Sequence, residues 1–259
     1  MKKQHWLRLL CPLLCLLLCL SGCGEQSSAL DRILSEKVIR VGLPPDFMPM
    51  SVETSEGVSG MSVDIALEVS KRLGAKPEFI FIGQDEALAA LEDGTVDCYM
   101  GFCTDDTKVK SSILTIGMGR LCRQAAVVSE SSDITQLVNL TGRTVALVSG
   151  SDAAAALDEA VVMKESLGEI IAAESEDELF ELLDSGECDA ALMCELRALY
   201  ELRHGSTDYR IVPDVLSEYH MVIAFHNRDS ALRERVTIIF GDMTDDGQMK
   251  QINERWFGQ

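Results

Sequence analysis

The sequence predicts an α/β protein built from two similar lobes. Short β-branched strands alternate with helix-patterned segments along most of the 259 residues, which is typical of largely parallel sheets covered by helices. A helix end, a glycine, an aspartate and an apolar strand occur twice, in LEDGTVDCYMG from Leu91 and in LDSGECDAALM from Leu183. The two copies are too far apart for a solenoid repeat, and the chain is long enough for two hydrophobic cores.

The first 22 residues are predicted to be an export signal. Basic side chains precede an apolar stretch from Leu9 to Leu20, which is shorter than the roughly 20 residues that span a bilayer. The exit LSGC resembles the lipobox of bacterial lipoproteins, in which the cysteine is lipidated and becomes the first residue. We therefore expect a lipid on Cys23, a tether over 23–36 and an extracytoplasmic protein anchored to the cell membrane. A plain cleaved signal with a spare cysteine is the alternative.

The charge of the exported chain argues against polyanionic partners. Loss of residues 1–22 removes three of the 23 basic residues and none of the 42 acidic ones, which leaves a formal charge of −22. Such a surface repels phosphate backbones and anionic headgroups. We expect no nucleic-acid partner, and membrane contact only through the lipid on Cys23.

The cysteines that follow Cys23 are odd in number, so they cannot all pair with one another. None of them forms a C-x-x-C motif, the spacing typical of zinc and redox sites. Cys98, Cys122 and Cys188 lie in apolar, strand-like segments and are interpreted as small core residues. One disulfide is compatible with the sequence, which does not select the pair among Cys98, Cys103, Cys122, Cys188 and Cys194.

In the first half of the chain, β-branched runs indicate strands and glycines end helices. KVIRVGL (37–43) is a β-branched run that stops at a proline pair, so it is expected to be a strand. SVDIALEVSKRLG (62–74) places apolar residues near helical spacing and ends at a glycine, as helices often do. There follow a strand KPEFIFI (76–82), a helix DEALAALEDG (85–94) and a strand TVDCYMGF (95–102).

The same alternation resumes in the second half. RTVALVSG (143–150) is expected to be a strand, and the alanine-rich segment 152–168 a helix. The remaining expected elements are a strand EIIAA (169–173), a helix EDELFELLDSG (176–186), the strands CDAALM (188–193) and YHMVIAF (219–225), and two helices over 230–245 and 248–256.

These segments, in this order, resemble the extracytoplasmic solute-binding proteins of amino-acid ABC importers, bacterial family 3. The similar stretches span Lys37 to Gly258 and include VIRVGLPPDFMPMSV, GMSVDIALEVSKRLG, ALEDGTVDCYMGF, LTGRTVALVSGSD, SGECDAALM and DDGQMKQINERWFG. The resemblance implies the type II periplasmic-binding-protein-like fold, in which two crossing hinge strands join the lobes. One lobe would comprise 37–121 plus 222–259 and the other 122–221, with crossings near 121–127 and 219–224. The expected partners are a small-molecule solute and an ABC permease in the membrane, and the expected state is a monomer.

The residues at the family's ligand-binding positions are unusual for an amino-acid site. The family's arginine for the ligand carboxylate falls on Lys108, which keeps the charge but lacks the bidentate fork. Its threonine for the same carboxylate falls on Asp152, which would repel that group by about 4 kcal/mol at ~4 Å and an effective dielectric near 20. Its aspartate for the ligand ammonium falls on Cys194. The other predicted ligand-binding residues are Phe47, Met50, Gln84, Cys103, Ser151 and Glu195.

Two arrangements of this altered set are compatible with the sequence. In the first, Asp152 and Lys108 pair when the lobes close, so the ligand needs no α-carboxylate. In the second, Asp152 and Glu195 receive a cation, so the solute carries an amine. The simpler alternatives are a solvated Lys108 and a Met50 that packs beneath the site. We expect a small polar solute that is amino-acid-like or amine-bearing.

Two other functions on this fold are retained as alternatives. A ligand-sensing lipoprotein could feed a receptor, and some relatives are periplasmic dehydratases. Such chemistry needs a positioned acid and base, and the sequence offers side chains of a suitable type without a spacing that indicates catalysis. They are Asp105, Asp106, Glu195, His204, His220 and His226. DMTDDG (242–247) begins like a calcium loop but has Asn253 where that loop needs glutamate. We therefore expect no catalytic residue, no metal and no cofactor.

Overall fold

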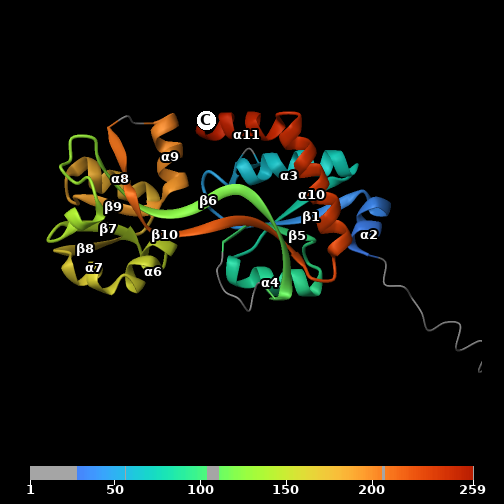
Figure 1. The fold of residues 1–259 in the computed structure, drawn as a ribbon, viewed down its shortest axis with the longest axis horizontal. Helices are drawn as coiled ribbons and strands as arrows, with labels where there is room; N and C mark the ends of the chain where they lie inside the picture. The colour runs from blue at the N-terminus through green and yellow to red at the C-terminus, as the bar shows by residue number, and fades with distance from the viewer. Residues whose placement is uncertain (1–27, 56, 104–110, 206–207, 259) are drawn as a thin grey trace, which may run out of the picture.

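One mixed sheet of eight strands runs through the computed structural model, which describes residues 28–55, 57–103, 111–205 and 208–258. Its strand order is β4-β1-β5-β10-β6-β9-β7-β8 (Figure 1). A separate hairpin pairs β2 with β3. The strands are β1 (Val38–Leu43), β2 (Val52–Thr54), β3 (Gly57–Ser59), β4 (Lys76–Phe81), β5 (Cys98–Cys103), β6 (Ile113–Ser129), β7 (Thr144–Val148), β8 (Glu169–Ala173), β9 (Ala190–Cys194) and β10 (Tyr209–His226).

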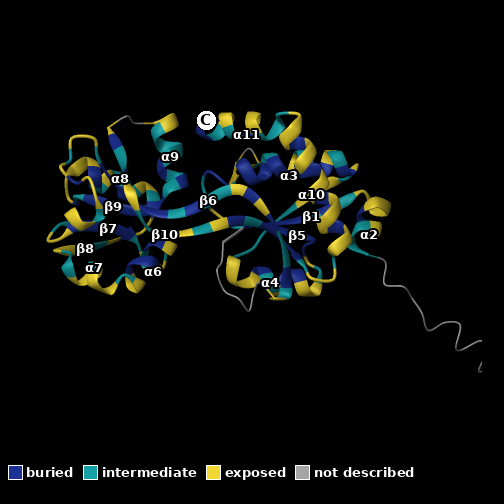
Figure 2. Cartoon of the chain, viewed as in Figure 1, coloured by how far each residue is buried: buried dark blue, intermediate teal, exposed yellow. Residues whose placement is uncertain are grey.

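Helices cover both faces of the sheet in each lobe, and apolar side chains fill the space between them (Figure 2). The first lobe has α2 (Ala29–Glu36), α3 (Met61–Leu73), α4 (Gln84–Asp93), α10 (Ser230–Asp245) and α11 (Gln248–Phe257). The second lobe has the 3-10 helix η1 (Leu137–Leu140), α6 (Asp152–Glu159), α7 (Val161–Ser166), α8 (Glu176–Ser185) and α9 (Glu195–His204). This pattern confirms the predicted α/β class.

The lobes are joined by β6 and β10, two antiparallel strands of 17 and 18 residues. Residues 124–127 of β6 pair with β9 of the second lobe. Residues 221–224 of β10 pair with residues 99–100 and 102–103 of β5, which belongs to the first lobe. Each strand therefore belongs to both halves of the sheet (Figure 1). These are the two predicted crossing strands, and they are much longer than the short crossings that the sequence suggested.

The repeated sequence motif corresponds to a repeated hydrogen-bond pattern. Asp97 Oδ2 accepts from the backbone N–H of Arg40 at 2.7 Å, and the N–H of Asp97 donates to the Arg40 carbonyl at 2.8 Å. Asp189 exchanges the same two bonds with Thr144, both at 2.8 Å. An arginine also binds each carboxylate, Arg40 at 3.2 Å and Arg143 at 3.4 Å. Each aspartate thus fastens the strand that follows its helix to the first strand of its own lobe.

Helix α2 corrects the predicted extent of the tether. Ser28 caps α2 because its Oγ accepts from the N–H of Asp31 at 3.2 Å. Ile33 is completely buried in the core of the first lobe, and Arg32 forms an ion pair with Asp97. Residues 29–36 are therefore part of the folded lobe, because their apolar side chains recur at helical spacing. No helix in the described ranges is long and apolar enough to cross a bilayer, and Cys23 lies outside those ranges.

Candidate ligand-binding site

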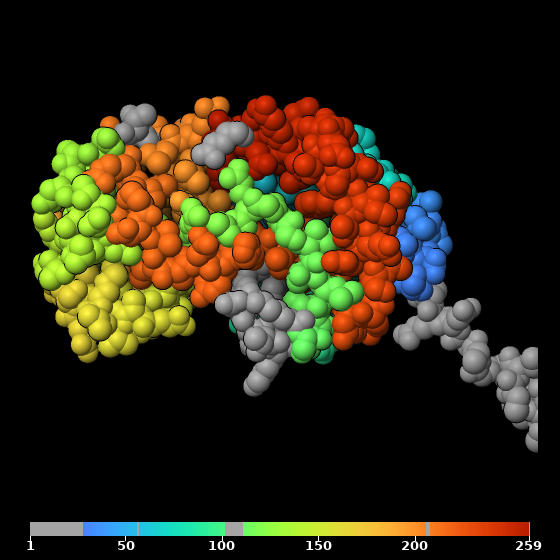
Figure 3. All heavy atoms as spheres, in the orientation of Figure 1, coloured from blue at the N-terminus to red at the C-terminus, as the bar shows by residue number. Residues whose placement is uncertain are grey.

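The predicted ligand-binding residues follow the carboxyl ends of parallel strands. Ligands of open α/β sheets bind outside these ends, because the strand-to-helix loops and helix N-termini meet there. In the first lobe the relevant strands are β1, β4 and β5, and in the second they are β7, β8 and β9. Helices α4 and α6 pack against the crossing strands on the same side (Figure 1). The surface is hollowed below β10 next to α6 and α7 (Figure 3).

The edge of the first lobe is formed by a tight turn after β1. The N–H of Phe47 donates to the Ser51 carbonyl at 2.8 Å, and the N–H of Met50 donates to the Phe47 carbonyl at 2.7 Å. Phe47 is partly exposed, whereas Met50 has no exposed surface and packs in the core. Met50 therefore packs in the core of the first lobe, as the simpler alternative had it. Gln84 is exposed at the first position of α4.

The structure describes no side chain for two further predicted residues of the first lobe, Cys103 and Lys108. Cys103 is the last residue of β5, where its backbone pairs with Met221 of β10. Lys108 lies outside the described residues. The proposed contact between Lys108 and Asp152 therefore stays a prediction.

In the second lobe, β7 leads into the N-terminus of α6. Ser151 is the N-cap, with its Oγ accepting from the N–H of Ala154 at 3.2 Å. Asp152 occupies the first turn, where the helix dipole favours negative charge. Its carboxylate is exposed, yet nearby protein atoms displace part of its hydration water and raise its pKa. No described residue forms an ion pair with Asp152, so no described side chain competes with a cationic ligand for this carboxylate.

The position predicted to bind the ligand ammonium is buried. Cys194 is 6% exposed, and its Sγ lies 3.8 Å from Sγ of Cys122. The hydrogen bond with Cys122 and the burial both raise the pKa of Cys194 well above its usual value, so the thiol stays neutral. A neutral, inward-facing thiol cannot replace an aspartate that receives an ammonium group. The burial of Cys194 therefore argues against it as the ammonium receptor, and its contact with the ligand stays a prediction.

Glu195 follows Cys194 and remains partly exposed, but its charge is shared. Its Oε2 lies 3.7 Å from Nη1 of Arg123, which also binds Glu218 at 2.6 Å. Arg120, whose guanidinium lies over the Phe257 ring, is a second cation attracted to Glu195. A ligand cation at Glu195 must therefore compete with two arginines of β6.

Sequence reasoning missed a third carboxylate in this region, Glu176. It occupies the first turn of α8, directly after β8, so carboxylates follow all three parallel strands of the second lobe. Burial raises the pKa of Glu176 from 4.5 to about 7, although Arg197 at 3.9 Å partly opposes the shift. The segment ESEDE (174–178), acidic and directly after an apolar strand, was the available signal.

The shifted pKa of Glu176 predicts a pH-dependent stability. Between pH 4.5 and about 7 the folded chain binds more protons at this group than the unfolded chain, so stability falls as pH rises through that window. We expect Glu176→Gln to abolish this loss and to stabilise the protein by about 1–2 kcal/mol at pH 8, a figure reduced for partial exposure. Urea unfolding at pH 5 and pH 8 measures the effect. The exposed neighbour variant Glu174→Gln should keep the wild-type pH dependence, and an unchanged dependence in Glu176→Gln would contradict the assignment.

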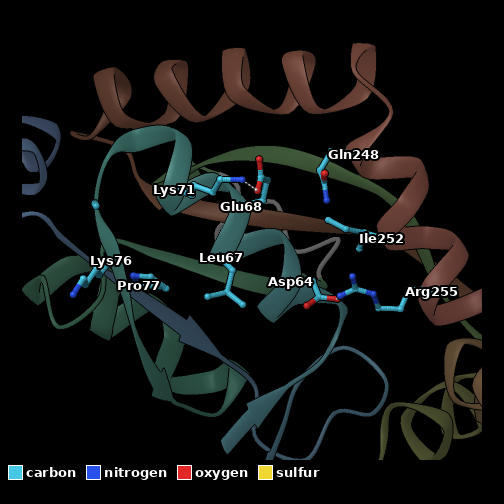
Figure 4. A pocket seen from close by; sticks show the side chains of 10 residues that line it. Asp64, Leu67, Glu68, Lys71, Lys76, Pro77, Gln248, Ile252 and Arg255 are labelled. Carbon is cyan, nitrogen blue, oxygen red and sulfur yellow. Dashed lines mark hydrogen bonds and ion pairs between the residues drawn. The ribbon is translucent and has the colours of Figure 1, made fainter.

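Three surface cavities lie away from the predicted site residues. One of about 490 Å³ adjoins Asp97 and α2, one of about 630 Å³ lies between η1 and the α6–α7 corner, and one of about 360 Å³ lies between α3 and α11. Figure 4 shows the last of these, where Lys71 faces Glu68 and Arg255 faces Asp64. These charges are already paired, at 3.0 and 2.9 Å, so a ligand there would have to displace ion pairs. The groove is better explained as a helix–helix junction.

Comparison with known proteins identifies the family. Residues 39–259 match the bacterial extracellular solute-binding proteins, family 3. The histidine-binding periplasmic protein of Escherichia coli is 25% identical over 85% of this chain and 87% of its own length. Among solved structures, Tv2483 bound to L-arginine is 26% identical with a TM-score of 0.67, covering 88% of this chain and 93% of that one.

The structural likeness extends to a reconstructed protein. An ancestral cationic amino acid solute-binding protein is 25% identical, with a TM-score of 0.77 over 89% of this chain and all of its own. The predicted two-lobed fold and the predicted family are thereby confirmed, and the Escherichia coli and ancestral proteins are named as binding proteins. The chain belongs to the bacterial extracellular solute-binding proteins of family 3.

Proposed function

We propose that this chain is the lipid-anchored substrate-binding component of an ABC importer for a small cationic solute, either a basic amino acid or a related amine. Asp152, which forms no ion pair with a described residue, carries this proposal; Glu195 and Glu176 follow the two other parallel strands of the second lobe, although each already faces an arginine. An amine between the lobes gains attraction from this acidic edge, whereas an acidic solute is repelled. The relatives named for histidine, arginine and cationic amino acids are consistent with the same charge preference.

Capture relies on closure of the lobes. A solute that contacts both lobes makes its full set of contacts only when they approach each other, so it favours the closed state by its differential affinity. The two crossing strands, β6 and β10, provide the hinge in this proposal, and the permease responds to the closed surface. The chain itself performs no chemistry.

Within this mechanism Asp152 is the principal cation receptor. Glu195 already faces Arg123, whereas no described residue forms an ion pair with Asp152. Lys108 is assigned to a carboxylate of an amino-acid ligand, if the ligand carries one. The partly exposed ring of Phe47 adds a cation–π contact or a stacking surface from the first lobe.

The anchoring and the lobe boundaries belong to the same proposal. The lipid on Cys23 and a short tether up to Ser28 hold the monomer beside its permease, since two or more acyl chains are needed for stable attachment. The first lobe then comprises residues 29–121 and 222–259, and the second comprises 122–221. The change of pairing partner along β6 and β10 supports divisions near these positions.

A thermal-shift panel tests the proposed ligand class. Arginine, lysine, histidine, putrescine and N-methylated amines represent the cations, with glutamine and glutamate as the neutral and acidic controls. A ligand that binds only the folded state stabilises it by about 2.7 kcal/mol at a hundredfold excess over its Kd. We expect shifts with one or more cations and none with glutamate. A shift in melting temperature with glutamate alone would overturn the proposal. No shift with any compound of the panel would favour a partner-binding role.

Asp152→Asn tests the receptor role directly. We expect about a tenfold rise in Kd for the cationic ligand, or about 1.4 kcal/mol, because a charged contact becomes a neutral one. Isothermal titration calorimetry measures the change. Glu159→Gln is the matched control, because it removes one exposed charge from the other end of the same helix. Equal affinities for Asp152→Asn and Glu159→Gln would exclude Asp152 from the site.

A further inference from the structure

Cys122 and Cys194 lie in contact at the junction between a crossing strand and the second lobe. Their sulfur atoms are 3.8 Å apart. Gln124 of β6 is paired with Cys194 of β9, and Cys122 precedes Gln124 by two positions. Side chains alternate along a strand, so all three point to the same face of the sheet. Consistent with this, the Gln124 amide donates to Sγ of Cys122 at 3.7 Å.

The other cysteines with described side chains have no comparable neighbour. Cys98 lies on β5 of the first lobe, and Cys188 lies in the core of the second lobe under α8. Within the described part of the chain, the structure shows a contact between two cysteine sulfur atoms at Cys122 and Cys194. Among the cysteines whose side chains the structure describes, the tertiary structure therefore selects one pair, which the spacing of the cysteines did not.

We propose that Cys122 and Cys194 form a disulfide that joins the crossing strand β6 to the start of α9. A disulfide has a sulfur separation of about 2.05 Å, so the two sulfur atoms must approach each other by roughly 1.8 Å to bond. Disulfides persist in extracytoplasmic compartments, where the family places this chain. Cys194 ends β9 and serves as the N-cap of α9, so its backbone is at a bend between two elements and can adjust.

The bond forms by thiol–disulfide exchange with a protein or small-molecule disulfide. Because its pKa is raised, Cys194 must first lose its proton to solvent; the small thiolate fraction then attacks one sulfur of that oxidant, which makes a mixed disulfide and releases the first thiolate. Cys122 then attacks the Cys194 sulfur of the mixed disulfide, forms the Cys122–Cys194 bond and releases the second thiolate. The two released thiolates take up the two protons, so the cysteines are oxidised and one oxidant disulfide is reduced. Cys194 attacks first because it retains 6% exposure, whereas Cys122 has none.

The bond would constrain a region where the lobes meet. Helix α9 of the second lobe contacts α11 of the first, with the rings of Tyr200 and Trp256 6.1 Å apart between centroids. Glu195, at the first turn of α9, faces Arg123 of β6. A Cys122–Cys194 bond ties the beginning of this helix to the strand on which the lobes hinge. The oxidised protein therefore holds α9 more firmly than the reduced protein.

Mass spectrometry of the full chain tests the pairing. One sample is equilibrated with oxidised glutathione and another with dithiothreitol; both are then denatured in iodoacetamide and digested without reduction. We expect a peptide pair linked through Cys122 and Cys194 in the oxidised sample and both residues alkylated in the reduced one. Alkylation of both after oxidation, or a link from either residue to Cys98, Cys103 or Cys188, would overturn the proposal.

Thermal unfolding of variants gives a second, independent readout. The bond closes a loop of roughly 70 residues, so the oxidised wild type should melt several degrees above the reduced form. Cys122→Ala and Cys194→Ala should each lose this difference. Cys98→Ala and Cys188→Ala remove equally buried thiols and should keep it. The same oxidised-minus-reduced difference in all four variants would contradict the assigned pair, and the comparison does not depend on the identity of the solute.

Discussion

Gly60→Ala is expected to destabilise the protein by at least about 3 kcal/mol, the sum of a backbone strain and a steric clash. Gly60 has φ +142°, a conformation that L side chains rarely adopt. A Cβ there would lie 2.2 Å from the carbonyl oxygen of Met50 and 2.5 Å from its carbonyl carbon. That carbonyl accepts the N–H of Ser62 at 2.9 Å, which holds the turn after β1 against the start of α3. Urea unfolding measures the loss.

Gly57→Ala separates the two causes. Gly57 begins β3 of the nearby hairpin with φ +124°, but a Cβ added there would meet no atom of a described residue within 4 Å, apart from its chain neighbours. Strain without a clash should cost only about 1–2 kcal/mol. Because the displaced turn carries Phe47, Gly60→Ala should also weaken solute binding, whereas Gly57→Ala should not. Equal losses of stability in the two variants would show that the close approach to Met50 is not important.

Asp97→Ala is expected to lower the free energy of unfolding by about 3 kcal/mol. Asp97 is 4% exposed, and its carboxylate binds the side chains of Arg32 and Arg40 as well as the backbone N–H of Arg40. Truncation leaves two partly buried guanidinium groups and one backbone donor without their acceptor, which costs more than the loss of an exposed ion pair. Chemical denaturation at low ionic strength measures the change.

The matched control is the equivalent residue of the second lobe. Asp189 makes the same two backbone bonds and one arginine contact, but its side chain is 36% exposed. Water can replace some of the hydrogen bonds that Asp189→Ala removes, so we expect the free energy of unfolding to fall by about 1 kcal/mol. If Asp189→Ala cost as much as Asp97→Ala, neither burial nor the additional ion pair with Arg32 would explain the stability of the first lobe.

Local signals in the sequence predicted the elements that can be recognised one at a time. The strand at 37–43 and the helix at 62–74 appear as β1 and α3, within one residue of their expected bounds. Helix α4 ends at Gly94 and α8 ends at Gly186, both with φ near +75°, as the repeated motif indicated. These features depend on side-chain spacing and backbone freedom within a few residues, which is information that a single segment contains.

Segments whose structure depends on distant partners were predicted less well. Helix α9 was missed, since it is rich in charged residues and Arg197 is stabilised by ion pairs with α8 and with Glu201. The single helix expected over 152–168 is interrupted at Ala160, ahead of two β-branched valines that have low helix propensity. Most of β6 and β10 was missed because these strands are held by pairing with each other and with β5 and β9, which lie far away in the sequence.

For the candidate site, the sequence by itself determined which residues follow the carboxyl ends of the strands, and among them Phe47 and Asp152 remain candidates for contact with the solute. Only the tertiary structure decided that Cys194 turns inward onto Cys122, that Arg123 reaches Glu195, and that Glu176 adds a third carboxylate. The physical reason is that local patterns show which loop follows which strand. The neighbours of a side chain, in contrast, depend on how strands that are many tens of residues apart in the sequence pair with each other. Burial and charge at the site are properties of those pairings.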